Sequence, residues 1–174
     1  PSGSGKSTLF RTLAGIWPYG TGKITFPRRA ESLFIPQRPY MPIGTLRAAA
    51  FYPAPSGDEK KLIRLMEECG LSQWIPSLGE TADWGRTLSL GEQQKLAFVR
   101  IFLHDAPYVF LDEASSAMDE DTETALYTRL VSDEKRTVVS VGHRSTLDRY
   151  HGRSLTIKDG QIVSRSLSGM KEEV

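Results

Sequence analysis

The chain has 174 residues, of which 39% are hydrophobic and 25% are charged, and its formal net charge is +1. These values are typical of one globular domain with its own core, and the balanced charge gives no indication of nucleic-acid binding. The single cysteine, Cys69, excludes an internal disulfide and favours a reducing compartment. No apolar run approaches the roughly 20 residues of a membrane helix, and no signal-peptide pattern is recognisable.

The first eight residues, Pro1-Ser2-Gly3-Ser4-Gly5-Lys6-Ser7-Thr8, match the phosphate-loop pattern G-x-x-x-x-G-K-[S/T] without its leading glycine. Its glycines allow a tight turn whose N–H groups converge on an anion at a helix N-terminus. Lys6 offers a charge to the outer phosphates, and the Ser7 hydroxyl is a suitable Mg²⁺ ligand. A Gly/Ser-rich bend can also be a plain loop, but a helical pattern follows at once. Because a strand must precede such a loop, we expect the chain to be a fragment.

Helix and strand patterns alternate in the first half of the chain. Proline-rich residues 36–42 predict a stiff, extended loop, and residues 53–57 and 79–87 predict polar loops. Helices are expected over residues 4–15, 45–50, 58–69 and 71–78, and short strands over residues 23–26 and 32–35.

The second half continues this alternation and ends in a hairpin. A helix is expected from Ser89 to His104, a buried strand over residues 108–111, a helix over 121–131 and a second buried strand over 137–141. Strands over 155–157 and 161–163 flank an Asp-Gly turn, and residues 164–174 form a polar tail expected to be frayed. The order predicts an α/β fold with a mainly parallel sheet, which binds ligands at the carboxyl ends of its strands.

Candidate catalytic residues follow the predicted buried strands. Asp112 and Glu113 end the first strand, so that one carboxylate could hold Mg²⁺ while the other polarises the attacking water. His143 directly follows the second strand. An isolated Asp-Glu pair is often only a solvated strand end, and a lone histidine is more often structural. Their place at the same sheet edge as the phosphate loop favours function.

A second anion-binding helix end is expected at Leu88-Ser89-Leu90-Gly91-Glu92-Gln93-Gln94. The segment combines a hydroxyl, a glycine backbone and a helix N-terminus. A capped helix is the simpler explanation when the segment is taken alone. Because one phosphate loop suffices for the nucleotide of this chain, a second anion site indicates a nucleotide held by another copy.

The chain resembles the nucleotide-binding domain of ABC transporters over nearly all of its length. The resemblance rests on Walker A at 1–8, the Q-loop at Gln37, the signature at 88–94, Walker B at 108–112, the catalytic Glu113, the D-loop at 116–119 and the switch histidine His143. Residues 34–47, 88–94 and 142–147 are similar to a narrower group, the bacterial exporter-type proteins with a fused permease. Relatives of that group are the peroxisomal acyl-CoA transporters and the SbmA/BacA-like permeases.

Two positions depart from the family pattern. The signature, usually LSGGQ, reads Leu88-Ser89-Leu90-Gly91-Glu92 here. It keeps Ser89 and Gly91, which in this family touch the γ-phosphate of the opposing nucleotide. Met118 replaces the usual leucine of the D-loop, a volume-conserving change that we expect to be mild.

The resemblance implies a role for each matching residue. Glu113 would be the general base, Gln37 would reach the Mg²⁺ or the attacking water, and His143 would contact the γ-phosphate. Asp119 would lie at the dimer interface. The residues that would wrap the phosphates of ATP are Ser2, Gly3, Ser4, Gly5, Lys6, Ser7 and Thr8. Those that would hold Mg²⁺ are Ser7, Gln37 and Asp112.

The resemblance further implies an ATP hydrolase that powers transmembrane transport. Two such domains would sandwich two ATP molecules head to tail, in a homodimer of half-transporters, and drive a permease domain fused upstream. The chain would then lie at the cytoplasmic face of the bacterial inner membrane, with the signature in a helical subdomain at about residues 45–104. The family's adenine-stacking aromatic residue would lie upstream of Walker A.

Other ATPase and nucleotide-binding classes fit the sequence less well. A soluble mechanical ABC ATPase would place a coiled coil before the signature, but only 83 positions separate Lys6 from Ser89, without a heptad run. A translation-associated tandem protein would need a second cassette upstream. A non-catalytic regulatory module is disfavoured by the presence of Glu113 and His143.

Overall fold

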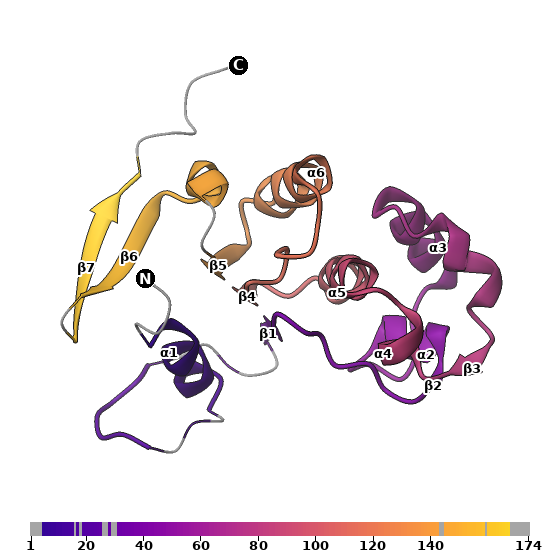
Figure 1. Cartoon of the computed structure of the whole chain (residues 1–174), viewed down its shortest axis with the longest axis horizontal. Coiled ribbons are helices and arrows are strands. Elements are labelled where there is room, and N and C mark those ends of the chain that lie inside the picture. The colour runs from indigo at the N-terminus through magenta and orange to yellow at the C-terminus, as the bar shows by residue number, and fades with distance from the viewer. Residues whose placement is uncertain are drawn as a thin grey trace.

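The computed structural model describes residues 5–15, 17, 19–25, 28, 31–142, 145–158 and 160–167. Within these ranges, the centre of the molecule is a three-stranded parallel sheet in the order β1–β4–β5 (Figure 1). The strands are β1 (Ser32–Ile35), β4 (Tyr108–Asp112) and β5 (Thr137–Val141). The prediction of an α/β fold with a parallel sheet is therefore confirmed.

Side chains alternate between the two faces of the central strand β4. Val109 and Leu111 are fully buried in the main core, whereas Phe110 belongs to a smaller cluster on the opposite face. There its ring meets Phe10 of α1 (Lys6–Leu13) edge to face, with the ring centroids 6.0 Å apart. Burial on both faces explains why residues 108–111 form one continuous apolar run.

The main core joins the sheet to a group of helices that lies beside it (Figure 1). The longest of these, α5 (Leu90–His104), packs against α2 (Leu46–Phe51) and α3 (Glu59–Glu68). Capping residues set where the helices begin: the side chains of Thr45, Asp58 and Ser89 each accept a main-chain N–H of the following turn. The shorter elements η2 (Ser72–Ser77) and α4 (Trp84–Thr87) complete the group.

In the last third of the chain, a helix packs against the sheet and a separate hairpin follows (Figure 1). Helix α6 (Glu120–Val131) packs against β5, and η3 (Ser145–Tyr150) follows that strand. The predicted hairpin is present as β6 (Arg153–Lys158) and β7 (Gln161–Ser166). None of the helices in the described ranges has the length and apolarity needed to cross a bilayer.

The predicted polar loop over residues 79–87 was wrong, and so was the predicted strand over 23–26 for residues 23–25; residue 26 lies outside the described part of the chain. Residues 23–25 form no strand, because no neighbouring strand in the described ranges offers them a hydrogen-bonding partner. Residues 79–87 instead contain β3 (Thr81–Ala82), paired with β2 (Gly44–Thr45), and helix α4. Trp84 causes the difference: it is 2% exposed and donates its indole N–H to the carbonyl of Gly44 at 3.0 Å.

The predicted frayed tail over residues 164–174 was wrong for its first three residues. Residues 164–166 belong to β7, where Ser164 pairs with Leu155 and Ser166 pairs with Arg153. The ladder continues because β6 begins at Arg153 and so offers β7 partners for its full length. Residues 168–174 lie outside the described part of the chain.

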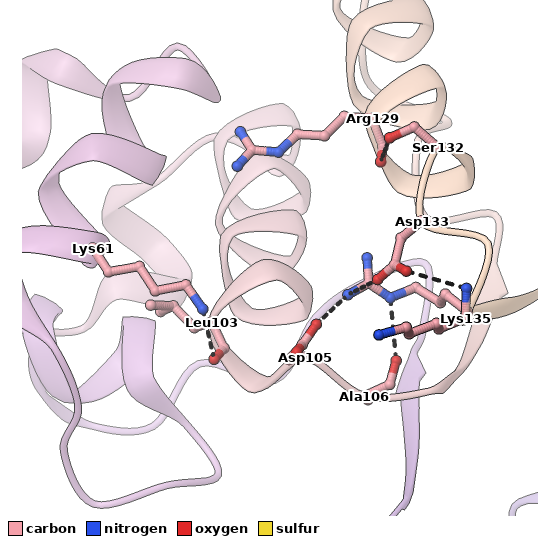
Figure 2. A network of polar contacts seen from close by, with 9 residues as sticks. Lys61, Leu103, Asp105, Ala106, Arg129, Ser132, Asp133 and Lys135 are labelled. Atoms are coloured by element: carbon pink, nitrogen blue, oxygen red, sulfur yellow. Dashed lines mark hydrogen bonds and ion pairs between the residues drawn. The ribbon is translucent and has the colours of Figure 1, made fainter.

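A buried arginine ties elements together at the end of the sheet opposite the predicted ligand edge. Arg136, whose side chain is 6% exposed, pairs with Asp105 at 2.9 Å and with Asp133 at 3.5 Å. Its Nε donates to the carbonyl of Ala106 at 3.2 Å. Figure 2 shows three of the residues involved, Asp105 and Ala106 after α5 and Asp133 after α6, near one another.

We predict that Arg136→Met lowers the free energy of unfolding of this domain by about 1–2 kcal/mol, because the Ala106 carbonyl loses a buried donor. Chemical denaturation of the intact protein measures the effect, with hydrogen exchange of the β4 and β5 amides as the readout. Arg86→Met is the matched control, since the ion pair of Arg86 with Asp83 is exposed and is expected to contribute less than about 1 kcal/mol. Equal stabilities of the two variants would contradict the prediction.

Candidate functional site

The first helix begins at a glycine whose backbone only glycine adopts readily. Gly5 has φ 87° and precedes α1, which carries Lys6, Ser7 and Thr8 in its first turn. Gly5 has no side chain with which to cap the helix, so the N–H groups of this turn are suited to an anionic ligand. The other predicted loop residues, Ser2 to Ser4, lie outside the described part of the chain.

A carboxylate at the end of β4 meets this first turn. The Ser7 hydroxyl donates to Asp112 Oδ1 at 3.3 Å, although 105 positions separate the two residues. Burial raises the pKa of Asp112, the hydrogen bond from Ser7 opposes this effect, and the neighbouring charge of Glu113 adds to it. Mg²⁺ prefers hard oxygen ligands, and a hydroxyl beside a half-buried carboxylate fits this ion.

Gln37 and Glu113 lie together at the same edge of the sheet. Gln37 follows β1 and Glu113 follows β4, and these two parallel strands are neighbours. The Gln37 amide donates to Glu113 Oε2 at 2.9 Å. Glu113 has φ 51°, a rare backbone conformation for a residue other than glycine, and its N–H donates to the carbonyl of Val141 at 2.9 Å. The backbone thus turns sharply where β4 ends and directs the carboxylate toward Gln37.

A cavity of about 100 Å³ lies beside Glu113. Its lining within the described part of the chain is Glu113, Ser115, Ser116, Glu123, Val141, Gly142 and Leu147. Gly142 immediately precedes the predicted switch histidine, but His143 itself lies outside the described residues. The end of β5 therefore contributes to the same cavity as the end of β4.

The second predicted anion-binding end is the start of α5. Ser89 and Glu92 form a reciprocal cap, in which the Ser89 hydroxyl accepts the N–H of Glu92 and Glu92 Oε2 accepts the N–H of Ser89. The hydroxyl also donates to Glu92 Oε2 at 2.7 Å, and the indole of Trp74 donates to Oε1 at 2.7 Å. Burial alone would raise the pKa of Glu92, but the hydrogen bonds from Trp74, Ser89 and Gln73 outweigh it and lower the pKa. The glutamate that departs from the usual signature therefore anchors the start of the helix.

Gly91 and the D-loop are in direct contact. A Cβ added to Gly91 would lie 2.9 Å from the main-chain oxygen of Ala117, closer than real Cβ atoms approach. Met118 is 5% exposed and belongs to the main core. Asp119 caps α6 by accepting the N–H and the hydroxyl of Thr122, and these hydrogen bonds lower its pKa. Asp119 is exposed and so is accessible to another molecule.

Gln94 was not predicted as a site residue, yet it connects the loops just described. It is 0% exposed on α5, and its amide contacts main-chain groups of Gln37, Glu113 and Ala117. Gln94 ends the predicted signature segment 88–94, but glutamine is common on exposed helix faces and the sequence carries no signal that this side chain is buried. Its burial depends on how α5 is seated against the two loops.

Comparison with known proteins decides the family. Residues 1–116 match the family model described as "ABC transporter". The chain belongs to the ABC transporter family. It is an ATP-binding domain of that family, whose ATP-binding domains hydrolyse ATP.

Similar curated proteins are transporters much longer than this chain. An uncharacterized ABC transporter ATP-binding protein of Haemophilus influenzae is 44% identical over 90% of the chain and 27% of its own length. The chloroplastic ABC transporter D family member 2 of Arabidopsis thaliana is 34% identical, over 100% of the chain and 32% of its own length. The human lysosomal cobalamin transporter ABCD4 is 35% identical, over 91% of the chain and 28% of its own length. The chain thus spans about a quarter to a third of these relatives.

A solved structure confirms the fold. A bacterial Atm1-family ABC exporter with ATP bound superposes on 95% of the chain and 32% of its own chain, with a TM-score of 0.83 and 23% sequence identity. Identity at this level supports the shared fold alone.

Proposed function

We propose that this chain binds and hydrolyses MgATP as the motor domain of an exporter-type membrane transporter. The observation that carries the proposal is the pairing of Ser7 with Asp112 and of Gln37 with Glu113 at one edge of the sheet. These pairs bring a metal-ligand set and a candidate base with its orienting amide to the end of the phosphate-binding helix. The relatives named above are transporters, and none of them is a soluble mechanical ATPase.

Each residue would act on a defined part of the reaction. Lys6 and the N–H groups from Gly5 onward would hold the phosphates, and Ser7 and Asp112 would hold Mg²⁺. The ion, when bound, supplies charge neutralisation at the phosphates. Glu113 would accept the proton of the attacking water, while the Gln37 amide holds one oxygen of the Glu113 carboxylate in place. On the resemblance alone, Ser2, Gly3, Ser4 and Thr8 would complete the phosphate loop, and His143 would contact the γ-phosphate.

A second copy would complete each ATP site. Ser89 and Gly91 would contact the γ-phosphate held by the partner, and the exposed Asp119 would lie at the interface between the copies. Helices and turns at about residues 45–104 would move as one subdomain when the two copies close. The length of the relatives supports a permease domain in the same polypeptide, which would place the chain at the cytoplasmic face of a bacterial inner membrane.

We predict that Asp112→Asn does not lower the melting temperature of the nucleotide-free protein at pH 7. The pKa of Asp112 is raised in the folded state, so its ionisation opposes folding as the pH rises above the usual range of aspartate. The amide removes this cost but is a poor ligand for Mg²⁺. In the wild type, MgATP should raise the melting temperature more than ATP with EDTA does, and we expect Asp112→Asn to lose this difference. We also expect its turnover of ATP to fall by at least about 100-fold.

Thermal melts and ATP hydrolysis of the intact protein test this prediction together with the proposed function. Asp121→Asn, at an exposed position of α6, is the control and should match the wild type. A full MgATP-dependent stabilisation of Asp112→Asn would contradict the assignment of Asp112 to the metal. Absence of Mg²⁺-dependent turnover in the wild type would overturn the proposed function itself.

A further inference from the structure

Gln94, near the start of α5, contacts two loops of the site through its side-chain amide: the loop after β1 and the turn after β4. Its Nε2 lies 2.9 Å from the carbonyl oxygen of Gln37, 3.2 Å from Ser116 Oγ and 3.4 Å from the carbonyl oxygen of Glu113. Its Oε1 accepts the N–H of Ala117 at 2.9 Å. The side chain is 0% exposed, so water does not compete for these contacts.

The chemistry of these partners fixes the orientation of the amide. The N–H of Ala117 can only donate, so it must face Oε1, and the carbonyls of Gln37 and Glu113 can only accept, so they must face Nε2. A flipped amide would place two oxygens against each other and two N–H groups together. This orientation of the amide satisfies both sides.

The groups that Gln94 holds belong to the residues proposed to carry the chemistry. Gln37 is held by its main chain, while its own side chain donates to the Glu113 carboxylate at 2.9 Å. Glu113 begins a turn with φ 51°, and Gln94 contacts both ends of this turn, the carbonyl of Glu113 and the N–H of Ala117. A rare backbone conformation persists only where its surroundings fix it.

We propose that Gln94 is a positioning residue for ATP hydrolysis, which sets the Gln37–Glu113 pair from the signature helix. Its amide holds the loop after β1 and the turn after β4 at one distance from α5. Ser89 and Gly91 lie at the start of the same helix. When they contact the nucleotide held by the partner copy, a movement of this helix would also move Gln94, and with it the Gln37–Glu113 pair. This inference rests on the proposed function, since it assumes that Glu113 acts in hydrolysis.

The test compares Gln94 with a buried polar side chain at the opposite end of the sheet, in the intact protein. Arg136, whose side chain is 6% exposed, donates to the main-chain carbonyl of Ala106, before β4 begins. Arg136→Met and Gln94→Met therefore each remove buried hydrogen bonds. Both should lower the melting temperature, but only Gln94→Met should lower kcat, by about tenfold or more, with KM for ATP changed by less than about threefold.

Gln94→Ala is the second variant, for the case that Gln94→Met does not fold. The smaller alanine leaves room for water beside the unpaired main-chain groups. This variant should show the same selective loss of kcat. Equal kcat values for the Arg136 and Gln94 variants would overturn the positioning role, as would a loss confined to KM. If the wild type binds ATP but shows no Mg²⁺-dependent turnover, the proposed function fails first and the inference fails with it.

Discussion

Glu113→Gln is expected to bind ATP as tightly as the wild type and to hydrolyse it about 10³-fold more slowly. The substitution keeps the size of the side chain and an oxygen that can accept the amide N–H of Gln37, now 2.9 Å from Glu113 Oε2. The amide has no basic oxygen to take the proton from water. Binding groups on α1 are untouched, so the loss should fall on the chemical step alone.

Single-turnover hydrolysis and ATP binding by the intact protein separate these two effects. Glu120→Gln is the matched control, because Glu120 is an exposed glutamate in the first turn of α6 and should leave both quantities unchanged. A rate for Glu113→Gln within a few-fold of the wild type would remove Glu113 from the role of base. Loss of ATP binding would instead indicate that the carboxylate helps to hold the nucleotide.

The features that could be predicted from the sequence are those determined by neighbouring residues. The continuous apolar run at 108–111 predicts a strand buried on both faces, and the two acids after it mark where that strand leaves the core. Ser89, Thr45 and Asp58 are cap residues, and the helices begin directly after them. The meeting of Ser7 with Asp112 follows from the rule that ligands of parallel sheets gather at the carboxyl ends of the strands.

The features that could not be predicted depend on contacts between distant residues. Trp84 turns a polar stretch into β3 and α4 because its indole reaches the carbonyl of Gly44, 40 positions away. Gln94 is buried only because α5 lies against both Gln37 and Ala117. Local pattern carries no information on either contact. The hydrogen bond from Trp74 to Glu92 could not be predicted either, since 18 positions separate the two residues. This bond explains how a glutamate that departs from the usual signature still stabilises the start of α5.

Gly91→Ala is expected to leave ATP binding at α1 intact and to reduce turnover by at least about 100-fold. The new Cβ would lie 2.9 Å from the main-chain oxygen of Ala117, which cannot rotate away as a side chain could. Either the start of α5 or the turn after Glu113 must therefore shift. Since Gln94 holds the N–H of that same Ala117, the shift would disturb both the start of α5 and the Gln37–Glu113 pair.

Gly79→Ala supplies the matched control, because a Cβ at Gly79 would meet no atom within 4 Å and its φ lies outside the left-handed range. Both variants lose the flexibility of glycine, but only Gly91→Ala gains a clash. Turnover at saturating MgATP measures the loss of hydrolysis. Light scattering in the Glu113→Gln background measures the association of two copies on ATP, which Gly91→Ala should abolish. If Gly91→Ala turned over and associated like Gly79→Ala, the contact between α5 and Ala117 would not govern closure, and the signature would have to act through Ser89 alone.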